Sequence, residues 1–248
     1  MSDTPKSGGR LPSELITDFA AASRILAAQG VVDGFGHVSM RHPDAPGRYL
    51  LARSMAPALV TPDDIIEYDL DSNAVNAAGR SGFLERFIHG EIYRARPDVM
   101  AVVHSHSPSV IPFGLVATSM RAMFHNAAFL AAGVPIFDIS EQFGATDMLV
   151  SDPDRGVALA ACLGDKHVGL MRGHGSVACG PSLKDAVFRA VYTEVSARIQ
   201  HWAVALAGDG PIAALSAEEG ELADVINRSA GVRAWDLWRS QVRATLGW

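Results

Sequence analysis

The sequence has few of the features that mark secreted or membrane proteins. Only two cysteines, Cys162 and Cys179, occur among 248 residues, too few for a disulfide framework. Its apolar runs are interrupted by charge or glycine well short of the roughly 18 residues that a membrane span needs. The opening stretch, MSDTPKSGGRLPSE, lacks the apolar segment of a signal peptide. We therefore expect a cytoplasmic protein with free thiols and no membrane partner.

Clusters of basic residues are missing as well. The formal net charge is −6, and Lys and Arg form no cluster along the sequence. Because nucleic-acid surfaces need clustered positive charge to neutralise phosphates, no nucleic-acid partner is expected. Hydrophobic residues make up 48% of the chain and charged residues 19%, the balance of a globular protein with an ample core.

Helical and strand patterns alternate along the chain. Residues 13–30 have apolar side chains at helical spacing, and residues 83–98 carry an apolar stripe that Pro97 ends. Short apolar runs between such segments indicate strands. Strands interleaved with helices predict an α/β domain in which helices cover a sheet. Further helices are expected at 152–164, at 182–208 and after 210, and strands at 36–43, 48–54, within 61–73, at 99–107, 134–139 and 167–180.

One expected strand ends in two histidines, in the stretch VVHSHSPSV at 102–110. Side chains alternate between faces along a strand, so His104 and His106 share a face, with Cα atoms roughly 6.5–7 Å apart. This spacing suits two imidazoles that bind one cation, because metal–nitrogen bonds are about 2.0–2.1 Å long. Taken alone, the pair could also be polar residues at the rim of a sheet. His174, between two glycines in RGHGS, could be a third ligand or an ordinary turn histidine.

Three motifs in the same order resemble the class II aldolase/adducin family: GHVSMR, ERFIHGEIYRARPDVMAVVHSHS and GHGSVACGPSLKDAVFRAVYTEVSA. The resemblance implies that His104, His106 and His174 bind one divalent metal ion per subunit. Three imidazoles with a nearby carboxylate suit Zn or Mn. The resemblance also implies a single-domain αβα sandwich around a mixed, largely antiparallel sheet, assembled as a homotetramer.

The chain is expected to divide into three parts. Residues 1–12 are predicted to form a flexible tail, and residues 13–210 the catalytic domain. Residues 211–248 are predicted to be a helical segment that packs on a neighbouring subunit. This segment contains Trp235, Trp238 and Trp248, apolar bulk that a single subunit is not expected to expose.

The family also uses a glutamate nineteen residues before the first ligand, which corresponds to Glu85 here. Glu85 begins the expected helix at 83–98, where the helix N-terminus favours a carboxylate. Its position makes it the first candidate for the acid/base group, and also a candidate metal ligand when substrate is absent. His89 lies one helical turn further on the same face and is interpreted as a packing residue or a residue that supports the site from behind.

The resemblance is weakest where sugar-phosphate enzymes of the family bind the phosphate. Those enzymes use an asparagine, a serine–glycine pair and a serine pair, which here are His37, Ser54–Met55 and Phe83–Leu84. A phosphate needs amides, hydroxyls or cations around it, and large apolar side chains offer none of these. We therefore expect these positions to bind a flat, partly apolar acid.

Three more residues are candidates for contacting that acid. Arg53 could pair with a carboxylate in bidentate fashion. His125 stands where sugar-phosphate-cleaving members carry a tyrosine acid, although a histidine hydrogen-bonded to a neighbour is an equal alternative. Together with His37, these residues resemble the decarboxylase branch, which acts on hydroxy-aromatic dicarboxylates such as 3-hydroxy-2-methylpyridine-4,5-dicarboxylate. Arg233 is a candidate because C-terminal segments of the family reach a neighbouring site, with an ordinary surface arginine as an equal alternative.

The sequence thus predicts a metal-dependent carboxy-lyase for a hydroxylated aromatic or heteroaromatic (di)carboxylate. The metal would hold a ring hydroxyl and its adjacent carboxylate, and Glu85 or His125 would protonate the ring carbon that loses CO2. A retro-aldol lyase for a non-phosphorylated hydroxy-keto acid is the alternative, and it would release an aldehyde instead. A non-catalytic, adducin-like binding protein is less favoured, because the three expected metal ligands are all present.

Overall fold

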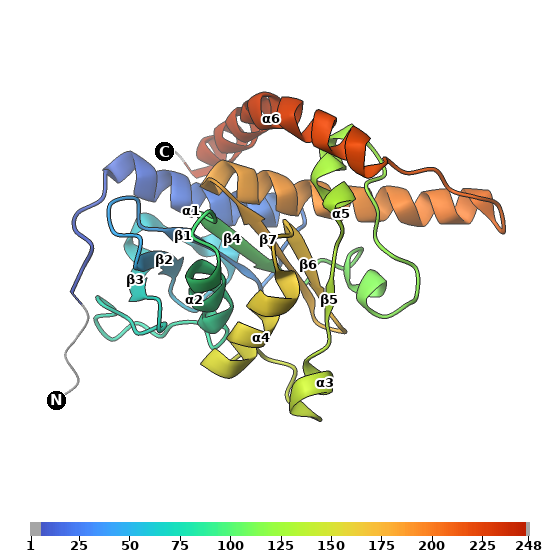
Figure 1. Cartoon of the computed structure of the whole chain (residues 1–248). Helices are drawn as coiled ribbons and strands as arrows, with labels where there is room; N and C mark the ends of the chain where they lie inside the picture. Colours follow the sequence, from blue (N-terminus) through green and yellow to red (C-terminus); the bar gives the residue numbers. More distant parts are fainter. Residues whose placement is uncertain (1–5, 247–248) are drawn as a thin grey trace.

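The structure is a computed structural model that describes residues 6–246. A seven-stranded sheet lies at its centre, with the strand order β3-β2-β1-β4-β7-β6-β5 (Figure 1). The β5–β6 pair is parallel and the other neighbouring pairs are antiparallel, so the sheet is mixed and largely antiparallel, as predicted. The strands are β1 (His37–Arg41), β2 (Arg48–Ala52), β3 (Ile65–Asp69), β4 (Ala101–Ser105), β5 (Ile136–Phe137), β6 (Val168–Met171) and β7 (Gly175–Gly180).

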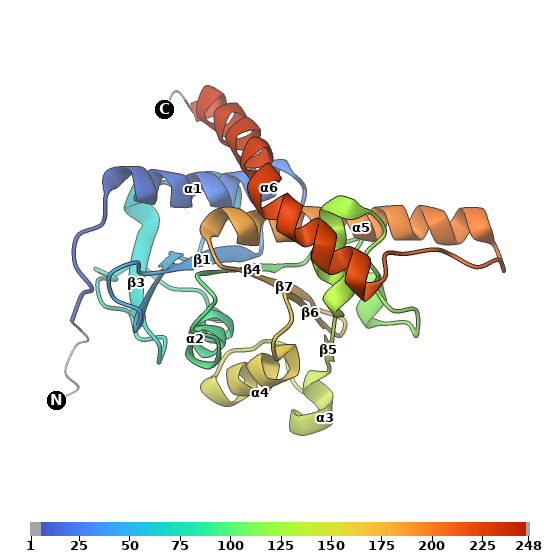
Figure 2. The same cartoon turned by 45° about the horizontal axis from the view of Figure 1, so that its top comes forward.

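Helices cover both faces of this sheet and complete the predicted αβα sandwich in a single domain. Helices α1 and α5 pack on one face with α6 outside them, whereas α2 and α4 pack on the other (Figure 2). The helices are α1 (Ser13–Ala28), α2 (Arg86–Ala95), α3 (Ile139–Phe143), α4 (Pro153–Leu163), α5 (Leu183–Ala207) and α6 (Ala217–Leu246), with 3-10 segments η1 (Pro57–Leu59), η2 (Pro62–Asp64), η3 (Ile111–Gly114) and η4 (His125–Ala132).

The two faces of the sheet carry two separate apolar cores. In β4, Ala101 and Val103 belong to the core under α1 and α5, while Val102 belongs to the core under α2 and α4. Because side chains alternate along a strand, a strand covered on both faces is apolar at every position. This explains the unbroken apolar run that precedes His104. None of the helices within residues 6–246 combines the length and apolar character that crossing a bilayer requires.

The N-terminal residues before α1 contact the edge of the sheet. The Ser7 hydroxyl and the Gly8 amide each donate a hydrogen bond of 2.6 Å to the carboxylate of Glu67 in β3. Residues 1–5 of the predicted tail lie outside the described part of the chain. The division of the chain at residues 12 and 210 stays a prediction.

The tryptophans near the C-terminus do not supply the exposed surface that the sequence suggested. Helix α6 crosses α1, α5 and η4, and within this single chain Trp235 is only 2% exposed and Trp238 only 7%. The expectation that these two side chains need a neighbouring subunit for burial is therefore wrong, because α6 buries them against its own domain. Trp248 lies outside the described residues.

Candidate metal centre and cavity

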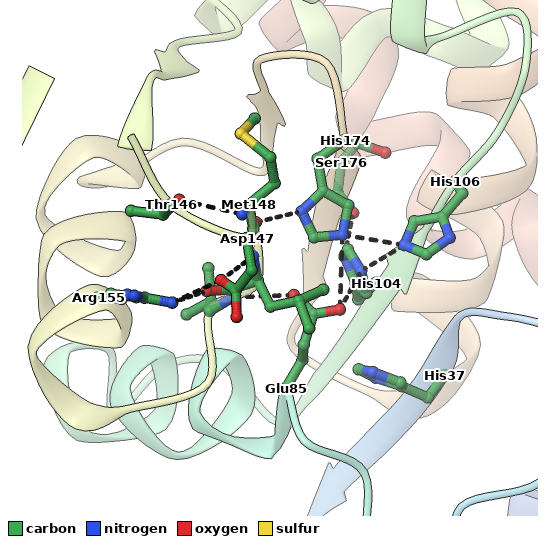
Figure 3. A network of polar contacts seen from close by, with 12 residues as sticks. His37, Glu85, His104, His106, Thr146, Asp147, Met148, Arg155, His174 and Ser176 are labelled. Atoms are coloured by element: carbon green, nitrogen blue, oxygen red, sulfur yellow. Dashed lines mark hydrogen bonds and ion pairs between the residues drawn. The ribbon is translucent and has the colours of Figure 1, made fainter. Parts of the chain in front are cut away.

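Four polar side chains meet at one end of the sheet (Figure 3). Strands β1 and β4 are antiparallel, so the beginning of β1 lies beside the end of β4, and His37 is paired with His104. His106 follows the last residue of β4, and His174 lies in the turn between β6 and β7. Glu85 is the residue immediately before α2. The topology thus brings three segments, distant in sequence, to one point and places His37 of β1 beside them.

Close packing behind His174 explains the glycine that follows it. A Cβ atom on Gly175 would lie 2.1 Å from the carbonyl oxygen of Ser105, far inside contact distance. Any side chain at this position would push the β6–β7 turn away from β4. Gly175 therefore lets His174 approach the histidines of the neighbouring strand.

The ring nitrogens of the three histidines face one another. Nε2 of His106 lies 3.1 Å from Nε2 of His104 and 3.0 Å from Nε2 of His174. A ring nitrogen carries either one hydrogen or one lone pair, so hydrogen bonding can satisfy only one of these two contacts. A single cation about 2.0–2.1 Å from each nitrogen would satisfy all three rings at once.

Backbone carbonyls fix the orientation of two of these rings. Nδ1 of His104 lies 3.1 Å from the carbonyl oxygen of Ser176, and Nδ1 of His174 lies 3.0 Å from that of Met148. Because a carbonyl only accepts, each Nδ1 is the protonated nitrogen, and in a neutral ring Nε2 then carries a free lone pair. Both lone pairs are directed at the common centre, which is the arrangement that metal-binding histidines need.

Glu85 adds negative charge beside the three rings. Its Oε2 lies 3.5 Å from Nε2 of both His104 and His174, and its Oε1 accepts a 3.0 Å hydrogen bond from the Val150 amide. Burial raises the pKa of Glu85, but when His104 and His174 are protonated their hydrogen bonds and positive charge outweigh burial and hold this pKa well below its ordinary value. Glu85 is therefore a carboxylate near neutral pH, able to bind a cation or to accept a proton.

The donor set fits a divalent metal. Burial, followed by the nearby His104 and His174, lowers the pKa of His106 to about 4, so this ring is neutral at pH 7. The donor atoms of the four residues all lie within 4.8 Å of one another. Three imidazoles and one carboxylate form a donor set that suits Zn or Mn.

A cavity of about 300 Å³ opens beside these residues. Its lining includes the apolar side chains of Met55, Phe83 and Leu84. The ring of Phe83 packs against that of His37, with 4.5 Å between the ring centres. Of the predicted site residues, those that line the cavity are His37, Ser54, Met55, Phe83, Leu84, Glu85 and His106.

Three predicted site residues belong neither to the metal centre nor to the lining of this cavity. Nε of Arg53 instead donates to a carboxylate oxygen of Asp64 at 2.6 Å. His125, the first residue of η4, is exposed. Arg233 is exposed on α6, where it shares a separate cavity with Asn126, the neighbour of His125. A single chain thus brings together the metal centre and the apolar side of the cavity, but not these three residues.

The sequence interpretation also missed part of the cavity, whose lining includes Gly34, Phe35, Gly36 and Leu149. The G-x-G stretch before His37 was an available signal. Gly36 has a φ of +90°, and a Cβ atom there would lie 2.6 Å from a side-chain carbon of Val32. Nothing in the sequence points to the Val150 amide, whose contact with Glu85 joins residues 65 positions apart.

Two decarboxylases are similar in sequence to the chain over nearly its whole length. Residues 17–201 match the family described as the class II aldolase and adducin N-terminal domain. The decarboxylase tropJ of Talaromyces stipitatus is 35% identical over 254 residues, covering 94% of this chain and 96% of that protein. A 3,4-dihydroxyphthalate decarboxylase of a Terrabacter species is 31% identical over 241 residues, covering 90% of this chain and 93% of that protein.

Solved structures share the fold. An aldolase II superfamily protein from Pseudomonas syringae has a TM-score of 0.77 at 20% identity, covering 95% of this chain and 96% of that one. An L-fuculose 1-phosphate aldolase from Glaciozyma antarctica has a TM-score of 0.76 at 20% identity, covering 98% of this chain and 95% of that one. At 20% sequence identity the two structures show that the fold is shared and nothing more. The family match and the relatives in sequence show that the chain belongs to the class II aldolase/adducin family.

Proposed function

We propose that the chain is a metal-dependent carboxy-lyase acting on a hydroxylated aromatic or heteroaromatic (di)carboxylate. That the protein is a carbon–carbon lyase follows from its family and from relatives that are decarboxylases. The observation that carries the substrate class is the cavity, which is lined by Glu85 and His106 of the metal centre and by an apolar side formed by Met55, Phe83 and Leu84.

The apolar side of the cavity suits a flat ring better than a phosphate. Phe83, Leu84 and Met55 offer no hydrogen-bond donor from their side chains. A dianionic phosphate placed against them would lose its hydration without compensation. An aromatic ring placed there gains apolar contact instead, while its polar substituents point to the histidines and Glu85.

His104, His106 and His174 would hold the metal, and Glu85 lies close enough to join them. When bound, the ion would supply a Lewis acid that stabilises negative charge on oxygen atoms of the substrate. The proton transfers are assigned to Glu85, which is ionised near neutral pH and can accept the proton of a ring hydroxyl.

Glu85 then passes this proton to the ring carbon that bears the carboxylate. The carbon–carbon bond to the carboxylate breaks, its electron pair returns to the ring, and CO2 leaves. The ring oxygen left negative takes a proton from solvent, so one proton is consumed for each CO2 released. The Val150 amide holds the other oxygen of Glu85 and keeps the carboxylate directed at the cavity.

We further propose that His125 and Arg233 act in the cavity of a neighbouring subunit within a homotetramer. Both are exposed, neither lines the cavity of its own chain, and the carbonyl oxygen of His125 accepts a hydrogen bond from Asn227 of α6, the helix that carries Arg233. Exposed apolar side chains on α5 and α6, including Trp202 and Leu206, provide surface for such contacts. Mixing an inactive Glu85→Gln variant with an inactive His125→Asn variant would then restore partial turnover, whereas a site contained in one chain would give none.

The decisive experiment measures CO2 release from hydroxy-aromatic mono- and dicarboxylates by protein loaded with Zn or Mn. We expect CO2 from at least one of these acids and little cleavage of sugar phosphates. Aldehyde release from a hydroxy-keto acid, without CO2 from any aromatic acid, would favour the retro-aldol alternative and overturn the proposal.

A further inference from the structure

Four buried polar side chains form a continuous hydrogen-bonded row behind the cavity. Nδ1 of His37 lies 2.7 Å from Nε2 of His89, and Nδ1 of His89 lies 2.6 Å from the Ser39 hydroxyl. The Ser39 hydroxyl in turn lies 2.7 Å from the hydroxyl of Tyr93. Strand β1 supplies His37 and Ser39, and α2 supplies His89 and Tyr93. We call this row the histidine relay.

The histidine relay touches the cavity only at His37. Ser39 and His89 are fully buried, Tyr93 is 1% exposed, and His37 alone lines the cavity. Figure 3 shows the His37 side chain extending from β1 toward the space beside Glu85 and His104. Nδ1 of His37 is occupied by His89, so Nε2 is the ring nitrogen left for a ligand.

The number of hydrogens on the four side chains decides in which direction the hydrogen bonds of the relay run. Two facing ring nitrogens 2.7 Å apart cannot both carry a hydrogen, and burial of both rings disfavours a charged form. Each ring is therefore neutral with one N–H, and each hydroxyl contributes one more hydrogen. Four hydrogens serve three contacts, so one hydrogen is left over.

The position of this last hydrogen follows from the partners of each group. Within residues 6–246, Ser39 is the one hydrogen-bond partner of the Tyr93 hydroxyl, and the Ser39 hydroxyl forms hydrogen bonds with Tyr93 and His89 alone. If the relay ran from His37 toward Tyr93, the Tyr93 hydrogen would be buried without an acceptor. If Ser39 accepted from both sides, its own hydrogen would be buried without one. Buried donors are rarely left in this state.

Only one direction of the hydrogen bonds leaves no buried hydrogen without an acceptor. Tyr93 donates to Ser39, Ser39 donates to Nδ1 of His89, and Nε2–H of His89 donates to Nδ1 of His37. The remaining hydrogen is then on Nε2 of His37, at the cavity wall, where a ligand can accept it.

We propose that Ser39 and His89 fix His37 as the Nε2–H tautomer, a permanent hydrogen-bond donor to a carboxylate oxygen of the substrate. His37 then contacts the substrate, Ser39 and His89 are positioning residues, and Tyr93 ends the relay by donating to Ser39. Naming a carboxylate as the group that His37 recognises rests on the proposed function. The relay itself does not, because it is a property of the protein without substrate.

The first test uses the protein without any ligand. Histidine labelled with a nitrogen isotope, read by proton–nitrogen correlation NMR, distinguishes a protonated from a bare ring nitrogen. We expect a protonated Nε2 and a bare Nδ1 for both His37 and His89. A protonated Nδ1 on His37 in the wild-type protein would overturn the proposal without any variant.

Two variants that each remove one buried hydroxyl test the order of the relay. Ser39→Ala cuts the link to His89, so His37 is expected to become a mixture of tautomers. Tyr93→Phe leaves the Ser39 hydrogen directed at His89, so His37 is expected to keep its tautomer. Equal loss of the tautomer in both variants would indicate general disruption of the core and would contradict the relay.

Binding to the Zn-loaded protein tests the ligand. Salicylate carries a carboxylate beside its hydroxyl, whereas catechol has no carboxylate. Ser39→Ala should weaken salicylate binding by about tenfold, the effect of one hydrogen bond to a charged group, and leave catechol binding unchanged. Equal weakening for both ligands would overturn the carboxylate assignment. Wild-type protein that shows the expected tautomer but binds neither ligand would uphold the relay and reject the proposed function, so the two failures are distinguishable.

Discussion

The cavity has two walls of opposite character. The polar wall is the metal centre of Glu85, His104, His106 and His174, of which Glu85 and His106 line the cavity, and the apolar wall consists of Met55, Phe83 and Leu84. His104 is fully buried and Glu85 is 8% exposed, whereas Leu84 is 64% exposed. The polar wall is held in place by backbone groups of Ser176, Met148 and Val150.

This difference separates the chemistry from the choice of substrate. A set of donors held by backbone contacts suits a metal and a proton transfer that need exact positions. Exposed apolar side chains gain stability only when a ligand or another subunit covers them. Variants of the polar wall should therefore abolish turnover, and variants of the apolar wall should change which molecules bind.

The largest expected effect is the loss of one metal ligand. His106→Ala should remove most of the bound metal and nearly all turnover, because two imidazoles remain where three converge. Elemental analysis measures the metal. His201→Ala is the matched control, since this exposed α5 histidine contacts the Ser109 carbonyl outside the centre. Full metal occupancy in a variant lacking all three histidines of the polar wall would contradict the assignment.

The next effect separates proton transfer from metal binding. Glu85→Gln keeps the size of the side chain but removes the basic oxygen, so turnover should fall by about 10²–10⁴, the usual share of general acid–base catalysis. Metal content should fall far less, because the three histidines remain. Glu91→Gln is the control, a buried glutamate on α2 that pairs with Arg94 rather than facing the cavity. Near-normal turnover in Glu85→Gln would mean that a group other than Glu85 transfers the proton.

The two walls also differ in how well the sequence predicts them. The three histidines could be predicted because their spacing and the glycines beside His174 reflect local geometry, and the family resemblance joined the segments. His106 even lies just beyond the end of β4, yet its ring still meets that of His104. The alternation of apolar runs likewise predicted most strands and helices.

Contacts between distant segments could not be predicted in this way. The Val150 amide binds Glu85 across 65 residues, and His89 meets His37 across 52 residues, in each case because two packed elements happen to align. The buried tryptophans of α6 show a related limit. Their composition predicts that they are covered, but it does not say whether the covering surface belongs to the same chain.

A smaller effect is expected from the apolar wall. Replacing both Phe83 and Leu84 with Ser should raise KM for an aromatic acid by about tenfold, at the low end of the cost of lost apolar contact in a pocket. Turnover at saturation should change less, because the polar wall is untouched. Val157→Ser, an exposed apolar position on α4 that does not line the cavity, is the control. An unchanged KM would show that the ring binds elsewhere.

The smallest effect is expected at Arg53, which lies next to the cavity residue Ser54 but is already paired with Asp64. Its side chain is 42% exposed, so solvent weakens any further ion pair, and the gain from one more carboxylate is about 0–1 kcal/mol. Arg53→Ala should therefore raise KM for a dicarboxylate only about threefold, with kcat nearly unchanged.

Comparing two substrates makes this small change informative. If Arg53 binds the carboxylate that is retained, KM should rise for a dicarboxylate and stay the same for the monocarboxylate that lacks this group. Arg53→Lys keeps the charge but not the planar fork, and should show an intermediate KM if the contact is bidentate. An equal rise for both substrates would mean that Arg53 acts only through Asp64 and the shape of the cavity. The retained carboxylate would then need another partner, and the exposed Arg233 of a neighbouring subunit would be the next candidate.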